Sequence, residues 1–351
     1  MLKIPVAVLA ATGAVGQRFV QLLADHPWFE VVAVTGSDRT VGAPYADGVN
    51  WVLPGDVPAS VANLTVQASE PDLDVPVVFS ALPTAEAREL EPKFAAAGYA
   101  VVTNASAFRM AEHVPLLIPE INPEHTELIC RQRESRGWSG FIVASPNCST
   151  TSIVLPMKIF QEAFGLRAAV ITTMQAISGA GYPGVPSMTI LDNVIPHIGG
   201  EDEKLENEPK KLLGSVDASG LTLADLRLSA QANRVPVMDG HLASVSVQFE
   251  QAASATDAIA ALQAWEPPAV CRELPSSPAQ VLVYRYEDDR PQPRLDRDAS
   301  EGLAWTVGKV RSCNVLDVRY LAITHNTLRG AASGSILNAE LLVVQGHIAR
   351  N

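Results

Sequence analysis

The sequence lacks several features that would assign it to other classes of protein. Its four cysteines, at positions 130, 148, 271 and 313, have neither the short spacing of a metal site nor the density of a disulfide-rich secreted protein. No apolar run is as long as a membrane span. Lys and Arg number 26 against 38 Asp and Glu, so the formal net charge of -12 leaves no basic excess for binding nucleic acid. These absences predict a cytoplasmic protein with no metal, nucleic-acid or membrane partner.

Apolar sequence is abundant, and its order indicates a layered α/β protein. Of the 351 residues, 47% are hydrophobic and 18% are charged, which is enough for a large core and two domains. Strand-like segments in the first half are residues 4–9, 30–34, 75–81, 99–103 and 140–144. Helix-like segments at residues 13–24 and 84–97 lie between them, and the first is expected to have an apolar face at Val15, Phe19, Leu22 and Leu23. This alternation predicts parallel βαβ units in a Rossmann-like, doubly wound sheet.

The pattern changes after residue 148. Predicted helices cover residues 149–163, 187–194, 200–213 and 333–347, and Pro209 is expected to break the third of them. Predicted strands cover residues 167–177, 241–249 and 319–324. Residues 287–301 are polar and rich in Pro, Arg and Asp, which predicts a surface loop.

Cys148 lies in the run SPNCSTT, residues 145–151, between an apolar strand and a predicted helix. A thiol at a helix N-terminus faces unpaired backbone N–H groups and the positive end of the helix dipole, which favour the thiolate. The same N–H groups suit an oxyanion formed when a thiolate attacks a carbonyl. A small buried hydrophobe is the alternative for any single cysteine, and the local sequence leaves both interpretations open.

The turn LAATGAVG, residues 9–16, joins the first strand to the first helix, as in dinucleotide-binding folds. The usual fingerprint has three glycines, and here Ala10 stands where the first would be. After the second strand, Ser37, Arg39 and Thr40 favour the 2′-phosphate of NADP. Asp38 is the type of residue that binds an unmodified ribose, so this segment alone does not exclude NAD.

Five motifs in this order resemble aspartate-β-semialdehyde dehydrogenases of the branch found in archaea, fungi and some bacteria. They are ATGAVG (11–16), NASAFRM (104–110), SPNCSTT (145–151), QAISGAGYPG (175–184) and NRVPVMDGH (233–241). The resemblance covers nearly the whole chain. It implies the NADPH-dependent conversion of aspartyl phosphate to aspartate semialdehyde, which feeds lysine (by way of diaminopimelate), threonine, methionine and isoleucine synthesis.

The resemblance also implies roles for individual residues. Cys148 matches the nucleophile that forms an acyl-thioester, His241 the acid–base residue, and Gln175 a residue that orients substrate or water. Substrate-binding positions are Arg109 for phosphate, Asn147, Glu201, Lys204, and Arg234 for the carboxylate. Glu201 and Lys204 stand three residues apart on one helix face. Solvent-exposed ion pairs have the same spacing, so the spacing alone is compatible with either role.

Cofactor-binding positions follow from the same resemblance. They are Thr12, Gly13, Ala14, Val15, Ser37, Arg39, Thr40, Ser80, Leu82, Gly179, Gly181 and Asn326. The implied architecture is an NADP-binding domain at 1–147, joined by a C-terminal helix at about 326–351, and a catalytic and dimerisation domain at 148–325. We expect the latter to be an α+β domain with a mixed sheet, helices on one side, and association into a homodimer or homotetramer.

Other functions are compatible with parts of the pattern. A malonyl-CoA reductase-like enzyme would use the same Cys148 and His241 but release CoA, leaving Arg109 and Lys204 without a phosphate. An N-acetyl-glutamyl-phosphate reductase fits residues 178–184 and 234–241 less well. A non-catalytic NADP-binding regulator would have no reason to keep Cys148, Gln175, Arg234 and His241 together.

Overall fold

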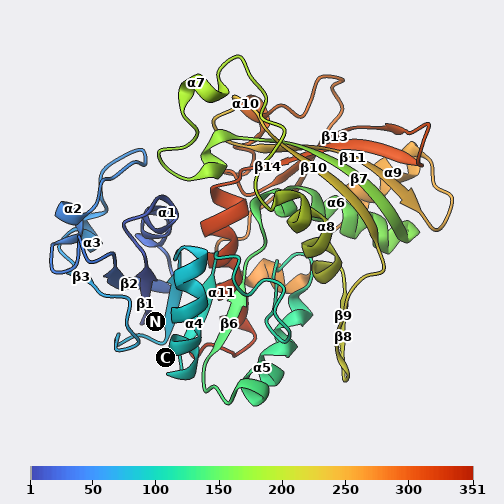
Figure 1. Ribbon diagram of the computed structural model, residues 1–351. Helices are drawn as coiled ribbons and strands as arrows, with labels where there is room; N and C mark the ends of the chain where they lie inside the picture. Colours follow the sequence, from blue (N-terminus) through green and yellow to red (C-terminus); the bar gives the residue numbers. More distant parts are fainter. Residues whose placement is uncertain (1, 351) are drawn as a thin grey trace.

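The apolar segments of the first half form a six-stranded parallel sheet in the computed structural model, which describes residues 2–350 (Figure 1). Its strands are β1 (Ile4–Leu9), β2 (Phe29–Thr35), β3 (Val66–Gln67), β4 (Val77–Ser80), β5 (Ala100–Thr103) and β6 (Phe141–Ala144). The strand order is β3-β2-β1-β4-β5-β6. The order reverses between β1 and β4, and such switch points are where doubly wound sheets bind ligands. The predicted Rossmann-like fold is confirmed.

Helices cover both faces of this sheet, which explains why β4, β5 and β6 are buried at every position. One face packs against α1 (Ala14–Leu23) and against α11 (Ser333–Val344), which returns from the end of the chain. The other face packs against α4 (Thr84–Ala96). The shorter helices near this sheet are α2 (Tyr45–Gly48), α3 (Ala59–Ala62) and α5 (Leu128–Arg136).

A second sheet of six strands is mixed, as predicted, and has the order β10-β7-β11-β14-β13-β12. Its strands are β7 (Leu166–Gln175), β10 (Arg227–Arg234), β11 (His241–Phe249), β12 (Leu282–Arg285), β13 (Trp305–Ser312) and β14 (Val318–Thr324). Helices α6 (Cys148–Phe164), α8 (Glu201–Leu212) and α9 (Ala255–Ala264) lie on one side of it (Figure 1). On the opposite face Val170 is exposed, and Leu242 and Ser246 are half-buried.

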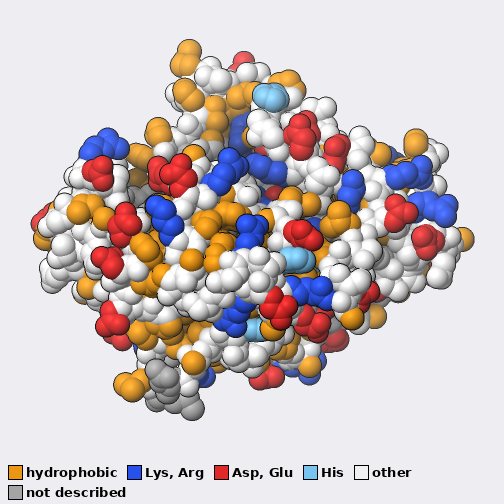
Figure 2. Space-filling model, turned by 60° about the horizontal axis from the view of Figure 1, so that its bottom comes forward, with side chains coloured by type: hydrophobic (Ala, Val, Ile, Leu, Met, Phe, Trp, Pro, Cys, Tyr) orange, Lys and Arg blue, Asp and Glu red, His pale blue; other side chains and the backbone are white. Residues whose placement is uncertain are grey.

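Short elements complete the chain. They are the hairpin β8 (Ser215–Asp217) and β9 (Gly220–Thr222), and the helical turns α7 (Ser187–Ile190) and α10 (Pro293–Asp296). The segment that carries α7 projects from the top of the molecule in Figure 1. Acidic and basic side chains are interspersed on the face shown in Figure 2. Within residues 2–350, no helix is both long and apolar enough to cross a membrane.

Three details differ from the sequence-based expectations. Helix α8 continues through Pro209. The proline has no N–H to donate, but it is buried and its carbonyl accepts from the N–H of Leu213, and these interactions offset the lost hydrogen bond. The predicted surface loop at 287–301 contains α10, organised by the buried Asp296, which accepts from Arg285 Nε at 2.9 Å. Val15, expected on the apolar face of the first helix, is 37% exposed.

Candidate active site

A cavity of about 300 Å³ lies where the loops after β4, β5 and β6 meet α8 and the ends of β7 and β10. It collects many of the predicted site residues: Val15, Leu82, Arg109, Asn147, Cys148, Gln175, Gly179, Glu201, Lys204 and Arg234. A larger cavity of about 620 Å³, beside Trp265 and Tyr284, is lined by none of them. We therefore place the candidate site in the smaller cavity, where reactive side chains converge.

Cys148 is the first residue of α6, and its sulfur lies 3.2 Å from Nε2 of His241. The side chain of Asn147 caps this helix by accepting from the backbone N–H of Ser149 at 2.9 Å. The backbone N–H of Ala176 donates to Nδ1 of His241 at 3.1 Å. A backbone amide can only donate, so Nδ1 is an acceptor and the proton of the neutral imidazole resides on Nε2, facing the sulfur.

The electrostatics of the pair differ from the expectation for an isolated helix N-terminus. Burial raises the pKa of the Cys148 thiol to about 12, and the charge of Glu201 adds to the increase. The positive charges of Arg109, Arg234 and Lys204 act in the opposite direction and lower the pKa of this thiol. Burial also lowers the pKa of His241 to about 3, and the Arg234 charge contributes in the same direction. The resting pair is thus a neutral thiol and a neutral imidazole, because loss of water outweighs the helix dipole.

Glu201 is the centre of a hydrogen-bond network at the base of the cavity. Its Oε1 accepts from Asn147 Nδ2 at 2.9 Å and from Lys204 Nζ at 2.8 Å. Its Oε2 accepts from Ser149 Oγ at 2.8 Å and from Gln175 Nε2 at 3.1 Å. Burial opposes ionisation of this carboxyl, but the hydrogen bond and charge of Lys204 hold its pKa below the usual value. The network leaves Glu201 as a fixed negative charge beside Cys148.

Arg234 ends β10 next to Gln175, its partner in the parallel register with β7. Its side chain is 6% exposed, lines the cavity, and donates from Nη1 to the carbonyl of Ala176 at 2.6 Å. Gly179 packs against this group: a Cβ there would lie 2.8 Å from Arg234 Nη1 and 2.9 Å from Cε1 of His241. The glycine therefore lets both side chains occupy the same small volume.

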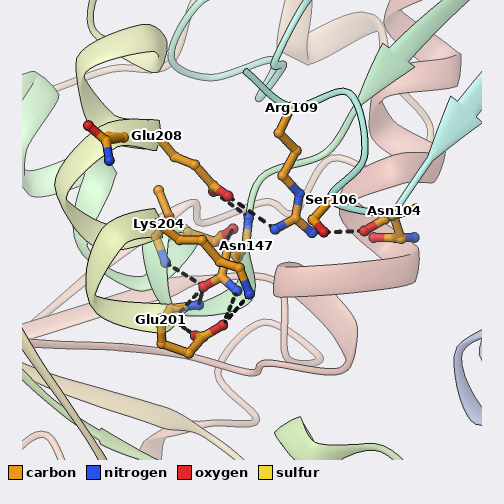
Figure 3. Close-up of polar contacts among 12 residues, drawn as sticks. Asn104, Ser106, Arg109, Asn147, Glu201, Lys204 and Glu208 are labelled. Carbon is orange, nitrogen blue, oxygen red and sulfur yellow. Dashed lines mark hydrogen bonds and ion pairs between the residues drawn. The ribbon is translucent and has the colours of Figure 1, made fainter. Parts of the chain in front are cut away.

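Arg109 enters the cavity from the loop after β5 and is held from two sides (Figure 3). Nη1 donates to Glu208 Oε1 at 3.1 Å, and Nη2 donates to the carbonyl of Asn104 at 2.8 Å. Its Nε and the Asn104 Nδ2 are buried donors without a partner among the residues described. Buried orphan donors are costly, and they suit an anion that would satisfy them.

Two family models match the chain. "Semialdehyde dehydrogenase, NAD binding domain" matches residues 5–129, and "Semialdehyde dehydrogenase, dimerisation domain" matches residues 157–329. The aspartate-semialdehyde dehydrogenase of Archaeoglobus fulgidus is 50% identical over 97% of this chain and 98% of its own length. That of Schizosaccharomyces pombe is 43% identical over 97% and 98%. The chain belongs to the aspartate-semialdehyde dehydrogenase family.

Solved structures agree with this assignment. The crystal structure of the Candida albicans aspartate-semialdehyde dehydrogenase with NADP has a TM-score of 0.91 and 40% sequence identity to this chain. The match covers 99% of this chain and 100% of the other. This dehydrogenase therefore has the family fold over the 99% of its length that the match covers.

The turn before α1 of this dehydrogenase fits a dinucleotide pyrophosphate. Helix α1 begins after Gly13 without a capping side chain, so its first N–H groups are available to an anion. A Cβ at Gly16 would lie 2.3 Å from the carbonyl oxygen of Ala10, so the strand end and the helix pack closely only with glycine. Ala10 takes the left-handed conformation, φ 54°, at the place where the fingerprint usually has glycine.

The other predicted cofactor positions of this dehydrogenase differ in accessibility. Thr12, Ala14 and Thr40 are partly exposed, and Ser37 and Arg39 are exposed. Ser80 is buried at the end of β4, whereas Leu82 lines the cavity. Gly181 has nothing within 4 Å of a Cβ position, in contrast to Gly179. Asn326 accepts from the Gly240 N–H and donates to Ser178 Oγ, both at 2.8 Å, so its contact with a nicotinamide stays a prediction.

Sequence reasoning missed several residues around the cavity of this dehydrogenase. They are Asn104, Ser106, Ser149 and Glu208. A signal for Glu208 was available, because positions 201, 204, 208 and 211 fall on one face of a helix. Asn104 and Ser149 lie inside the motifs at 104–110 and 145–151. The contacts of Ser149 with Gln175 and Glu201 join distant segments, so its motif alone does not reveal them. Within residues 2–350 no cluster of metal-ligating side chains is present.

Proposed function

We propose that this chain catalyses the NADPH-dependent reductive dephosphorylation of L-4-aspartyl phosphate to L-aspartate 4-semialdehyde. The product supplies lysine, threonine, methionine and isoleucine synthesis. The observation that carries the proposal is the contact of 3.2 Å between Cys148 Sγ and His241 Nε2, because Cys148 lines the same cavity as Arg109 and Arg234. Cys148 acts as the nucleophile and holds the aspartyl group as a thioester.

The charged side chains have complementary roles in substrate binding. Arg234 takes the α-carboxylate, for which a planar guanidinium is well suited. Glu201 takes the ammonium group, supported by its depressed pKa. Arg109 and Lys204 bind the phosphate. Asn147 and Gln175 donate hydrogen bonds to Glu201 and so hold it beside the turn that carries the nucleophile.

The proton transfers in the proposed reaction follow from the neutral resting state of Cys148 and His241. As Sγ attacks the acyl carbon, the S–C bond forms, the C–O bond to phosphate breaks, and the thiol proton ends on the departing phosphate. When bound, NADPH would supply the hydride that reduces the thioester; the C–S bond breaks as the aldehyde forms, and the Cys148 sulfur takes up a proton from water, which restores the thiol. His241 Nε2–H donates its hydrogen bond to the oxygen that gains negative charge, a role in which a neutral donor suffices.

The dinucleotide is assigned to the turn at residues 12–15, to Ser37, Arg39 and Thr40 near the adenosine, and to Ser80, Leu82, Gly179, Gly181 and Asn326 near the nicotinamide. Support comes from the uncapped N-terminus of α1 and the close packing at Gly16. The proposed division of the chain is an NADP-binding domain at 1–147 with about 326–351, and a catalytic and dimerisation domain at 148–325.

We also propose a homodimer or homotetramer in the cytoplasm. The open face of the second sheet, where Val170 is 52% exposed, supports association through that surface. Light scattering tests it, and a monomer at micromolar concentration would exclude it. Four cysteines without a disulfide among the described residues are consistent with a reducing compartment.

The deciding experiment is NADPH formation from aspartate semialdehyde with phosphate or CoA as the varied acceptor. Arg109 and the orphan donor of Asn104 predict saturable dependence on phosphate and none on CoA. Dependence on CoA instead would establish the acyl-CoA reductase activity. NADP binding without turnover with either acceptor would support a non-catalytic regulator.

A further inference from the structure

Glu208 is a buried carboxylate, 2% exposed, that joins two segments next to the reacting atoms. Its Oε1 accepts from Arg109 Nη1 at 3.1 Å, and its Oε2 accepts from the backbone N–H of Asn147 at 2.6 Å (Figure 3). Asn147 directly precedes Cys148. Glu208 thus connects the phosphate-binding arginine of the proposed mechanism with the turn that carries the nucleophile.

The same face of α8 also holds the backbone of the Arg109 loop. Lys211 Nζ donates to the carbonyls of Arg109 and Ala111, both at 2.8 Å. Burial lowers the pKa of Lys211 to about 8, and the charge of Glu208 opposes that decrease. Lys211 therefore anchors the main chain of the loop while Glu208 anchors the guanidinium.

Glu208 and the carbonyl of Asn104 determine which donors of Arg109 remain available to a ligand. Glu208 uses Nη1 and the Asn104 carbonyl uses Nη2, while Nε has no partner among the described residues. An arginine side chain that is free to rotate loses conformational entropy when a ligand immobilises it, and this loss weakens binding. Here the Arg109 side chain is already ordered by its two hydrogen bonds, so an anion binds to donors whose direction is fixed before it arrives.

We propose that Glu208 is a positioning residue that fixes Arg109 relative to the Cys148 sulfur, so that phosphate meets the acyl carbon in the reactive geometry. The role rests on the proposed function and extends it to a residue that does not touch substrate. Loss of the Glu208 carboxylate should weaken phosphate binding and leave the binding of aspartate semialdehyde and of NADP unchanged.

The variant that tests this is Glu208→Gln, assayed as NADPH formation with aspartate semialdehyde, NADP and phosphate. An amide can accept from one of the two donors but turns its own N–H groups toward the other, so Arg109 is released or misdirected. We expect KM for phosphate to rise about tenfold, equivalent to about 1.4 kcal/mol. KM for aspartate semialdehyde and for NADP should change by less than about twofold, within ordinary context effects. Glu203→Gln, exposed on the same helix, is the matched control.

A double-mutant cycle separates positioning from general structural support. In an Arg109→Ala background, Glu208→Gln should produce no further rise in KM for phosphate. A rise that persists without Arg109, or a lower kcat at unchanged KM for phosphate, would refute the positioning role. If the Gln variant does not fold, Glu208→Asp keeps the charge but is one methylene too short to span both partners, and the same rise is expected. Wild-type enzyme inactive with phosphate would instead refute the proposed function.

Discussion

The two sides of the cavity are built in different ways. The substrate side uses buried charged side chains whose partners are already in place, such as Glu201, Arg234 and Glu208. The cofactor side uses the backbone of the turn at 12–15 and exposed residues at 37–39. The contrast indicates that substrate recognition depends on preorganised charges, whereas cofactor recognition depends on chain shape. Changes on one side should therefore leave the other largely intact.

The strongest test of this separation is Cys148→Ala. Without the nucleophile no thioester forms, and turnover should fall by at least about 10⁴-fold. NADP affinity, measured by quenching of intrinsic fluorescence, should stay within about twofold because the residue is absent from the cofactor turn. Phosphate-dependent turnover in this variant would exclude the covalent mechanism.

The next test compares two arginines on opposite sides. Arg234→Leu removes a buried guanidinium proposed to bind the substrate carboxylate, so KM for aspartate semialdehyde should rise about 100-fold or more, at least about 2.7 kcal/mol. Arg39→Ala, an exposed residue of the cofactor side, should raise KM for NADP about tenfold and leave KM for aspartate semialdehyde unchanged. An effect of either substitution on both constants would show that the two sides are coupled.

A buried carboxyl below the loop that carries Asn104 and Arg109 supplies a test by pH. Glu91 of α4 is fully buried and accepts from Thr103 Oγ1 at 2.5 Å, at the end of β5. Burial raises the pKa of Glu91 from 4.5 to about 7. Folding therefore favours the protonated form, and the stabilisation is complete below pH 4.5 and lost as pH rises through 7.

Glu91→Gln imitates the protonated carboxyl at every pH. Relative to wild type, its free energy of unfolding in urea should be similar at pH 4.5 and higher at pH 8 by up to about 3 kcal/mol. KM for NADP should not change, because Glu91 is hydrogen-bonded to Thr103 rather than to the cofactor turn at 12–15. An equal difference in stability at both pH values would show that Glu91 ionises normally in the folded protein.

Local patterns predicted five of the six strands of the first sheet but only β7, β11 and β14 of the second, and they missed α5 and α9. The bounds of β1 and β11 agree with the expected strands, and the motif around Cys148 marks the start of α6. Alternation of buried and exposed residues along β11 is a local property, so the sequence reveals it directly. Motifs also directed attention to Arg234 and Gln175, although their side-by-side placement depends on the pairing of β7 with β10.

Properties that arise from burial could not be predicted from the sequence. The neutral state of Cys148 and His241 depends on how much water the folded chain excludes, which no motif specifies. Continuation of α8 through Pro209 depends on packing that offsets the lost N–H bond. The dual contact of Glu208 joins three segments that are far apart in the chain. Each is a tertiary effect that overrides a local tendency.

The close packing at Gly179 has a consequence for the mutational tolerance of the enzyme. Arg234 and His241 both lie within 3 Å of the place where a Cβ would be, and both are buried. Every other amino acid begins with that atom, so alanine encounters the same overlap as a bulky residue. The usual ranking of substitutions from conservative to radical therefore does not apply at this position, where the site is defined by the absence of a single carbon.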